Sequence, residues 1–247
     1  RQEGWSYKLD SKEDKLSYNG VVYNEMKGAF SSPEGVLDRV VLNTLFPDTS
    51  YANESGGDPE FIPDLTYEQF LDFHRTYYHP SNSYIYLYGD MDMEEKLNWL
   101  DQEYLSRYDA ADVDSEIRLQ KPFEEMVEKE IPYSIASEEP EEENTYLSYN
   151  KVIGTSLDKE LYLAFQILDY ALLSAPGAPL KKALTDAGIG KDIIGSYDNG
   201  IYTPVFSVIA KNAEPEQKTE FVDTLATGLK IIVTNDMGKQ ALETGIN

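Results

Sequence analysis

The sequence predicts an α+β protein in which antiparallel strands are layered against long helices. One observation leads to this fold class, and a second to the division of the chain into two domains. Both halves of the 247-residue chain mix strand-like and helix-like segments, which is typical of layered α+β domains. The stretch from Ala110 to Pro122 is polar and irregular, as expected of a linker between domains of ordinary size. The chain is therefore expected to divide into residues 1–120 and 121–247.

Hydrophobic periodicity and capping residues place the elements of the first half. Ser32 is a good N-cap with Pro33 at the first helical position, and the stretch from Thr66 to Gln69 fits a capping box. Tyr84–Tyr88 is a continuous apolar run of strand length, which predicts a central strand. The expected elements are strands at 5–9 and 84–88 and helices at 20–30, 33–45, 67–79 and 93–108.

The second half is expected to alternate between strands and helices. Asp198-Asn199-Gly200 is a hairpin signal between two strand-like runs. The run from Asp158 to Ser174 is strongly apolar and of helix length, and Ala175–Pro179 breaks it. The expected elements are strands at 125–131, 145–152, 193–197 and 202–210 and helices at 158–174, 180–187, 219–233 and 238–247.

Composition narrows the classes of function. Hydrophobic residues make up 41% of the chain and aromatic residues 12%, which is enough for a globular core. The formal net charge of −24 disfavours binding to nucleic acids or to anionic membranes, and it favours a basic peptide as partner. The alternative is that the acidity serves solubility alone. No apolar run approaches the ~20 residues of a membrane span, and no signal peptide is visible.

Cysteine is absent from the sequence. Its absence excludes disulfides, thiolate metal sites and cysteine nucleophiles. It also fits a reducing compartment, and we expect a cytoplasmic location. No Gly-x-Ser-x-Gly elbow is present, which disfavours a serine hydrolase.

Glu25 is the first candidate functional residue. It lies in the segment Gly20–Phe30, where Val21, Val22, Met26 and Ala29 fall near helical spacing and predict a core stripe. A carboxylate so close to an apolar stripe is costly unless it is paired. The residues alone leave two interpretations open: a surface glutamate at the edge of an amphipathic helix, or a carboxylate ligand to a metal.

The remaining candidates favour structural roles. His74 and His79 are five residues apart, so they do not offer the paired ligands of an i, i+4 motif, and packing or capping is the preferred interpretation for both. Ser55–Pro59 lacks the lysine and the spacing of a phosphate-binding loop. The acidic run Glu138–Glu143 lacks the spacing and the glycine of a calcium loop, so a solvated charge run is expected.

Five stretches, taken in order, resemble the insulinase/pitrilysin superfamily of zinc peptidases, and most closely its presequence-protease-like branch. They are Gln2–Trp5, Asn24–Phe30, Ser55–Pro59, Leu65–Phe70 and Phe73–Asn82. A thinner resemblance continues afterwards. It runs through Ala183–Gly188 and Phe206–Val208.

The resemblance implies two-layer α/β sandwich domains with mixed, largely antiparallel sheets of the insulinase/processing-peptidase type. Residues 1–120 would form the C-terminal part of a first, metal-binding domain, and residues 121–247 the N-terminal part of a second, peptidase-like domain. Both domains would be partial.

The resemblance also implies a role for Glu25, as the third ligand of a catalytic Zn²⁺. In this family a His-x-x-Glu-His helix supplies two histidine ligands and a glutamate general base, and we expect that helix upstream of Arg1. The chain would then hold an incomplete zinc site, contain no catalytic residue and be inactive alone. The expected activity of its parent is that of a zinc metalloendopeptidase that degrades unfolded peptides, and the expected partners are such peptides and the rest of the polypeptide.

Two alternatives stay open from the sequence. One is a non-catalytic, chamber-forming or structural member of the same superfamily. The other is an acidic peptide-binding module that folds by itself.

Overall fold

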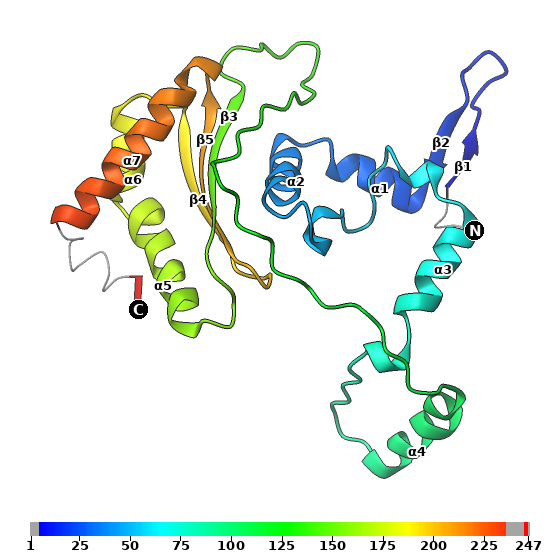
Figure 1. Cartoon of the computed structure of the whole chain (residues 1–247). Helices are drawn as coiled ribbons and strands as arrows, with labels where there is room; N and C mark the ends of the chain where they lie inside the picture. The colour runs from blue at the N-terminus through cyan, green and yellow to red at the C-terminus, as the bar shows by residue number, and fades with distance from the viewer. Residues whose placement is uncertain (1–4, 236–244, 247) are drawn as a thin grey trace. The chain divides into compact units, whose positions relative to one another are not determined.

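The computed structural model describes residues 5–235 and 245–246 (Figure 1). By their contacts, the residues form two compact units. Unit 1 comprises Arg1–Phe30 and Asn53–Arg118, and unit 2 comprises Ser31–Ala52 and Leu119–Asn247. The segment Ser31–Ala52 thus packs with the second unit although it lies early in the chain. The predicted assignment of 1–120 and 121–247 to two peptidase domains stays a prediction.

Unit 1 is mainly helical and begins with a β-hairpin. Strands β1 and β2 pair antiparallel, with Trp5 opposite Gly20 and Lys8 opposite Ser17. Thr66 caps α3 through the predicted capping box, because its side chain accepts from Gln69 N and the Gln69 side chain accepts from Thr66 N. The elements are β1 (Trp5–Lys8), β2 (Ser17–Gly20), α1 (Val21–Ala29), η2 (Ile62–Asp64), α3 (Tyr67–Tyr77), η3 (Pro80–Asn82), α4 (Met93–Glu103) and η4 (Leu105–Arg107).

The predicted central strand at Tyr84–Tyr88 is wrong. Among the described residues this stretch has no partner strand, and the side chains of Tyr84, Tyr86 and Tyr88 are more than four-fifths exposed. A strand needs a neighbouring chain to satisfy its N–H and C=O groups, and an apolar run does not supply one. Met26 is the one buried apolar side chain among the described residues of unit 1, so this unit has a thin core.

Unit 2 is built on a three-stranded antiparallel sheet in the order β3-β5-β4. The central strand β5 (Val205–Ala213) pairs with β3 (Thr145–Val152) and with β4 (Asp192–Asp198). The strands predicted at 145–152, 193–197 and 202–210 are confirmed, the last with shifted ends. The strand predicted at 125–131 is wrong, because no regular element covers those residues.

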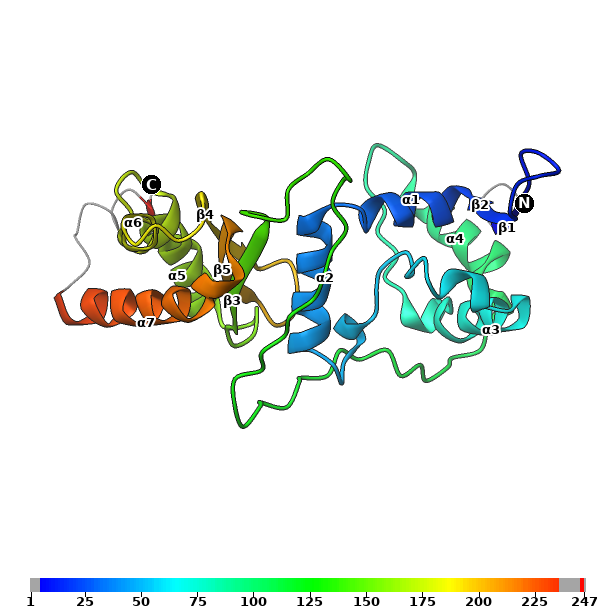
Figure 2. The same ribbon diagram turned by 90° about the horizontal axis from the view of Figure 1, so that it is seen from above.

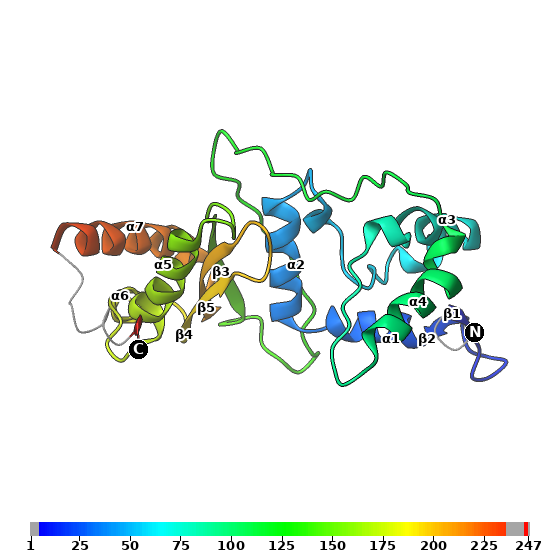
Figure 3. The same ribbon diagram turned by 90° about the horizontal axis from the view of Figure 1, so that it is seen from below.

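The two faces of this sheet carry different helices, as Figures 2 and 3 show. One face packs on α5 (Lys159–Asp169), α6 (Pro179–Asp186) and α7 (Lys218–Asn235). Alternation along the strands sends Leu147, Ile193 and Val208 into this main core. Together with the buried leucines of the helices, these residues form one contiguous hydrophobic cluster.

The opposite face receives α2 (Pro33–Leu45), with Ser32 as N-cap and Pro33 at the first position as predicted. Its attachment to the sheet includes polar contacts. Glu34 Oε1 accepts hydrogen bonds from Lys211 Nζ at 2.5 Å and from the Tyr146 hydroxyl at 3.1 Å. Beyond the helix, Phe46 is buried and packs on Tyr51, whose hydroxyl accepts from Tyr202 N.

Helix α5 continues into a π-helical turn at Tyr170–Ser174, where one continuous α-helix was predicted. Within this turn Ala171, Leu172 and Leu173 are all buried. Of the helix predicted at 238–247, residues 238–244 and 247 lie outside the described part of the chain.

The predicted α+β class with antiparallel sheets is confirmed. Within the described ranges, none of the helices combines the length and the apolar character that crossing a membrane requires.

Candidate functional site around helix α1

Helix α1 carries Glu25 and starts directly after strand β2. Gly20 precedes it without a side-chain cap. The predicted core stripe is only partly right, because Met26 is buried and Val22 half-buried while Val21 and Ala29 are exposed. Met26 packs against the loop at Gly56, whose φ of +89° favours glycine; a β-carbon there would lie 2.6 Å from the Met26 sulfur.

Glu25 is exposed on this helix, one residue before the buried Met26. Between residues 5 and 235, and at 245–246, no group of three or more His, Cys, Asp or Glu side chains is placed to hold a metal ion. A zinc site needs three protein ligands and an open position. The described residues therefore do not form a zinc site by themselves, and Glu25 could serve one only with ligands from elsewhere.

The two histidines have structural contacts. His79 Nδ1 accepts a hydrogen bond from Ser81 N at 3.1 Å and so caps η3, and its ring meets Tyr108 edge-on. His74 stacks on Tyr78 with 4.6 Å between ring centroids. These contacts agree with the packing and capping roles expected from the spacing of the histidines.

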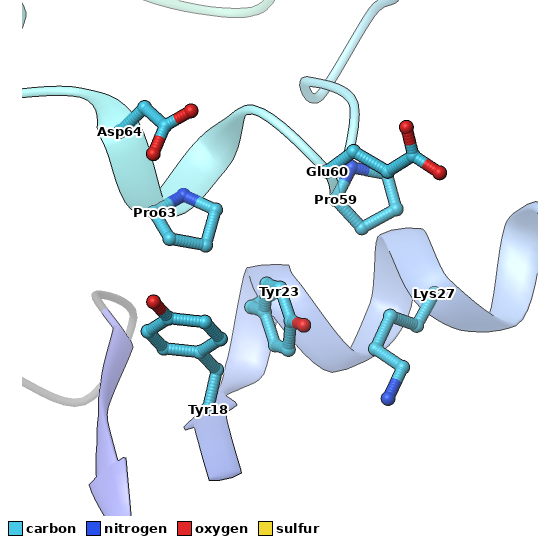
Figure 4. A pocket seen from close by; sticks show the side chains of 7 residues that line it. All are labelled: Tyr18, Tyr23, Lys27, Pro59, Glu60, Pro63 and Asp64. Atoms are coloured by element: carbon cyan, nitrogen blue, oxygen red, sulfur yellow. The ribbon is translucent and has the colours of Figure 1, made fainter.

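A pocket of about 390 Å³ lies beside α1, within unit 1 (Figure 4). The lining side chains come from three segments: the end of β2, one face of α1 and the stretch 59–64. They are Tyr18, Tyr23, Lys27, Pro59, Glu60, Pro63 and Asp64. Tyr23 and Lys27 are four residues apart and share a helix face, whereas Glu25 lies halfway between them in sequence and so points to the opposite side.

The aromatic wall of the pocket is held by ring contacts. Tyr18 meets Tyr23 edge-on at 5.8 Å between centroids, and Trp5 meets Tyr18 in the same way at 5.0 Å. The Tyr7 phenol, which stacks on Tyr18, is the largest cause of a raised Tyr18 pKa, and the charge of Asp64 adds to it. Tyr18 therefore stays a neutral phenol at neutral pH.

The charges around the pocket are one cation and two carboxylates. The Lys27 ammonium lies 5.6 Å from the centre of the Tyr23 ring. Glu60 and Asp64 are exposed, and neither forms an ion pair with any residue of the described ranges. The sequence did not reveal this pocket, because residues 18–27 and 59–64 are far apart in the chain and only the fold joins them. The two prolines close to two carboxylates in Pro59–Asp64 are the only local signal.

Comparison with known families relates the chain to M16 peptidases. The profile of the "peptidase M16 inactive domain" matches residues 64–247. Over its whole length the chain is 50% identical to the protein HypA of Clostridium perfringens and 35% identical to presequence protease 1 of Arabidopsis thaliana. It spans 25% and 23% of these two proteins, so it corresponds to about a quarter of each.

Solved structures show a similar fold at low identity. A conserved protein of Enterococcus faecalis aligns with a TM-score of 0.66 at 10% identity, over 91% of this chain and 51% of its own. The peptidase M16 inactive domain of Pseudomonas fluorescens aligns with 0.61 at 16% identity, over 91% and 53%. Pitrilysin aligns with 0.51 at 19% identity, over 89% of this chain and 24% of its own.

Proposed function

Because this chain belongs to the peptidase M16 inactive-domain family, we propose that it is part of a larger zinc metalloendopeptidase that degrades unfolded peptides. The predicted likeness to the presequence-protease-like branch of the insulinase/pitrilysin superfamily is confirmed by the relatives. The observation that carries the proposal is the 35% identity to presequence protease 1 along the whole chain, including the α1 region. A cytoplasmic location stays a prediction.

In this proposal Glu25 is the carboxylate that the chain contributes to the metal. It is exposed on α1 and so available to a metal held by residues beyond this chain. It precedes residues 64–247, which match the inactive domain. Unfolded peptides are the proposed substrates and the rest of the polypeptide the proposed partner, and the net charge of −24 favours basic peptides.

The test compares three forms of the full-length protein: the natural sequence, Glu25→Gln and Glu68→Gln. Glu68 is an exposed glutamate on α3 and serves as the control for loss of one charge. Zinc content and cleavage of an unfolded peptide are measured side by side. Glu25→Gln should lower zinc binding and the cleavage rate by about 10–100-fold or more. Substitution of residues that only hydrogen-bond to metal ligands already has effects in that range. Full activity and full zinc content in Glu25→Gln would contradict the ligand role.

The 247-residue chain alone should neither hold zinc tightly nor cleave peptides, because Glu25 is the single family ligand that it contains. Stoichiometric zinc in this chain would contradict that expectation. A second candidate is a non-catalytic member of the superfamily, which the description of the matched family as inactive favours. In that case the full-length protein would hold no zinc and cleave nothing, with or without the substitution.

A further inference from the structure

The pocket beside α1 combines flat ring faces with excess negative charge. Tyr18, Tyr23, Pro59 and Pro63 supply the walls, and Glu60 and Asp64 outnumber Lys27. Figure 4 shows the rings of Tyr18 and Tyr23 facing the Pro59–Asp64 segment across the pocket. Its volume of about 390 Å³ lies at the small end of the range for ligand sites, which fits one side chain better than a folded partner.

The aromatic wall already attracts a cation. Lys27 holds its ammonium over the Tyr23 ring at 5.6 Å from the centroid, within the range of cation–π attraction. The two carboxylates have no ion-pair partner in the described part of the chain, so a second cation would find both of them available. Aliphatic stems of lysine and arginine pack well along rings while the charged head stays near water.

Other ligands fit this pocket less well. An anion would face two unpaired carboxylates. An uncharged apolar group would take water from Glu60 and Asp64 without giving them a partner, which is costly. A metal ion is disfavoured because the described residues gather no set of ligands here.

We propose that this pocket binds the cationic side chain of an arginine or lysine in an unfolded peptide. The stem of that side chain lies between the tyrosine and proline rings, and its charged head lies near Asp64 and Glu60. The proposal goes beyond the peptidase activity, since this binding needs no metal and Glu25 lies on the opposite face of α1.

The binding test uses dye-labelled nonapeptides of serine and glycine with one central residue: arginine, lysine, citrulline or norleucine. Citrulline keeps the shape of arginine without its charge. Fluorescence anisotropy is measured with the full-length protein at low salt and with a zinc chelator, so that the peptides are not cleaved. Arginine and lysine peptides should bind about 4- to 25-fold more tightly than citrulline and norleucine peptides. That range combines one exposed ion pair with one cation–π contact.

Three variants locate the binding. Asp64→Asn should weaken binding of the arginine peptide about two- to five-fold, whereas Asp101→Asn, an exposed position on α4 with the same change in charge, should not. Lys27→Met should strengthen it about two- to five-fold, because the competing cation is removed. Equal binding of arginine and citrulline peptides, or equal effects of Asp64→Asn and Asp101→Asn, would overturn the proposal. Glu25→Gln should leave this binding unchanged, so failure of the zinc proposal and failure of this one give different results.

Discussion

The carboxyl oxygen Oδ1 of Asp169 lies against the backbone of Gly195, so that a β-carbon at position 195 would stand only 2.5 Å from it. The same β-carbon would lie 2.6 Å from Leu173 Cδ1. Asp169 ends α5 and Gly195 lies in β4, so the missing side chain lets the helix approach the sheet closely. Oδ1 is buried there without a hydrogen-bond partner among the described residues.

Gly195→Ala should destabilise the protein by about 1–3 kcal/mol, because the added methyl overlaps two side chains of a packed interface. The matched control is Gly200→Ala in the same unit, where the nearest atom to an added β-carbon is Asp198 Oδ1 at 3.8 Å. Thermal unfolding of both variants beside the natural sequence measures the difference. Equal stabilities of the two variants would show that α5 does not depend on this close approach.

Asp169→Asn should raise stability at pH 7, because it removes the charge of a partly buried carboxyl group whose Oδ1 has no hydrogen-bond partner among the described residues. Burial raises the pKa of Asp169 above its ordinary value of 3.8, because the charged form loses water. Because the folded state raises this pKa, protonation of Asp169 stabilises the folded protein. This contribution is fully present below pH 3.8 and is lost as pH rises through the folded pKa. The gain from Asn should therefore shrink as pH falls toward 3.8. Urea unfolding at several pH values tests this, and a gain that grew on acidification would contradict it.

Lys211→Met should lower stability at pH 7 by less than about 1 kcal/mol, because it removes a partly exposed ion pair while keeping most of the stem over Tyr146. The hydrogen bond from Lys211 is the main cause that lowers the pKa of Glu34 below 4.5. A lowered carboxyl pKa stabilises the folded state above pH 4.5, and this contribution is lost as pH falls through the folded pKa.

The loss caused by Lys211→Met should therefore be smaller at pH 3 than at pH 7. Lys182→Met is the control, because Lys182 pairs with Asp186 on the surface of α6, where both side chains are more exposed. Equal losses for the two variants at pH 7 would show that the Lys211 pair is an ordinary surface pair.

The isolated 247-residue chain should self-associate through the exposed stretch Tyr84–Tyr88, which combines aromatic side chains with a backbone that pairs with no strand of the described residues. Tyr86→Lys should reduce this association and the binding of a dye that reports apolar surface. Val233→Lys adds the same charge at an equally exposed apolar residue of α7 and should have little effect. Sedimentation at several concentrations measures association, and a monomer at all of them in the natural chain would contradict the prediction.

Local signals predicted the helices well, because a cap acts within four residues. Ser32, Thr66 and Gln69 form the hydrogen bonds that their positions indicate. The strands at Tyr84–Tyr88 and 125–131 were wrong because a strand depends on a partner that hydrophobic pattern alone does not supply. The site followed the same rule: Glu25 could be placed on a helix, but the pocket joins residues 18–27 to residues 59–64 only after folding. Asp169 lay within an apolar helical run, which was a signal of the buried carboxylate.

Because Ser31–Ala52 belongs to unit 2, this unit can complete its fold only late in synthesis. Glu34 is made 177 residues before its partner Lys211, and Tyr51 is made 151 residues before Tyr202. At a synthesis rate of roughly 5–20 residues per second, strand β5 with Lys211 is made about 9–35 s after Glu34. During that interval the rings of Phe46 and Tyr51 can already pack on each other, but Tyr202, the partner of the Tyr51 hydroxyl, is still to be made. The residues of unit 1 between 53 and 118 emerge meanwhile, so the second unit closes only after the first has been synthesised.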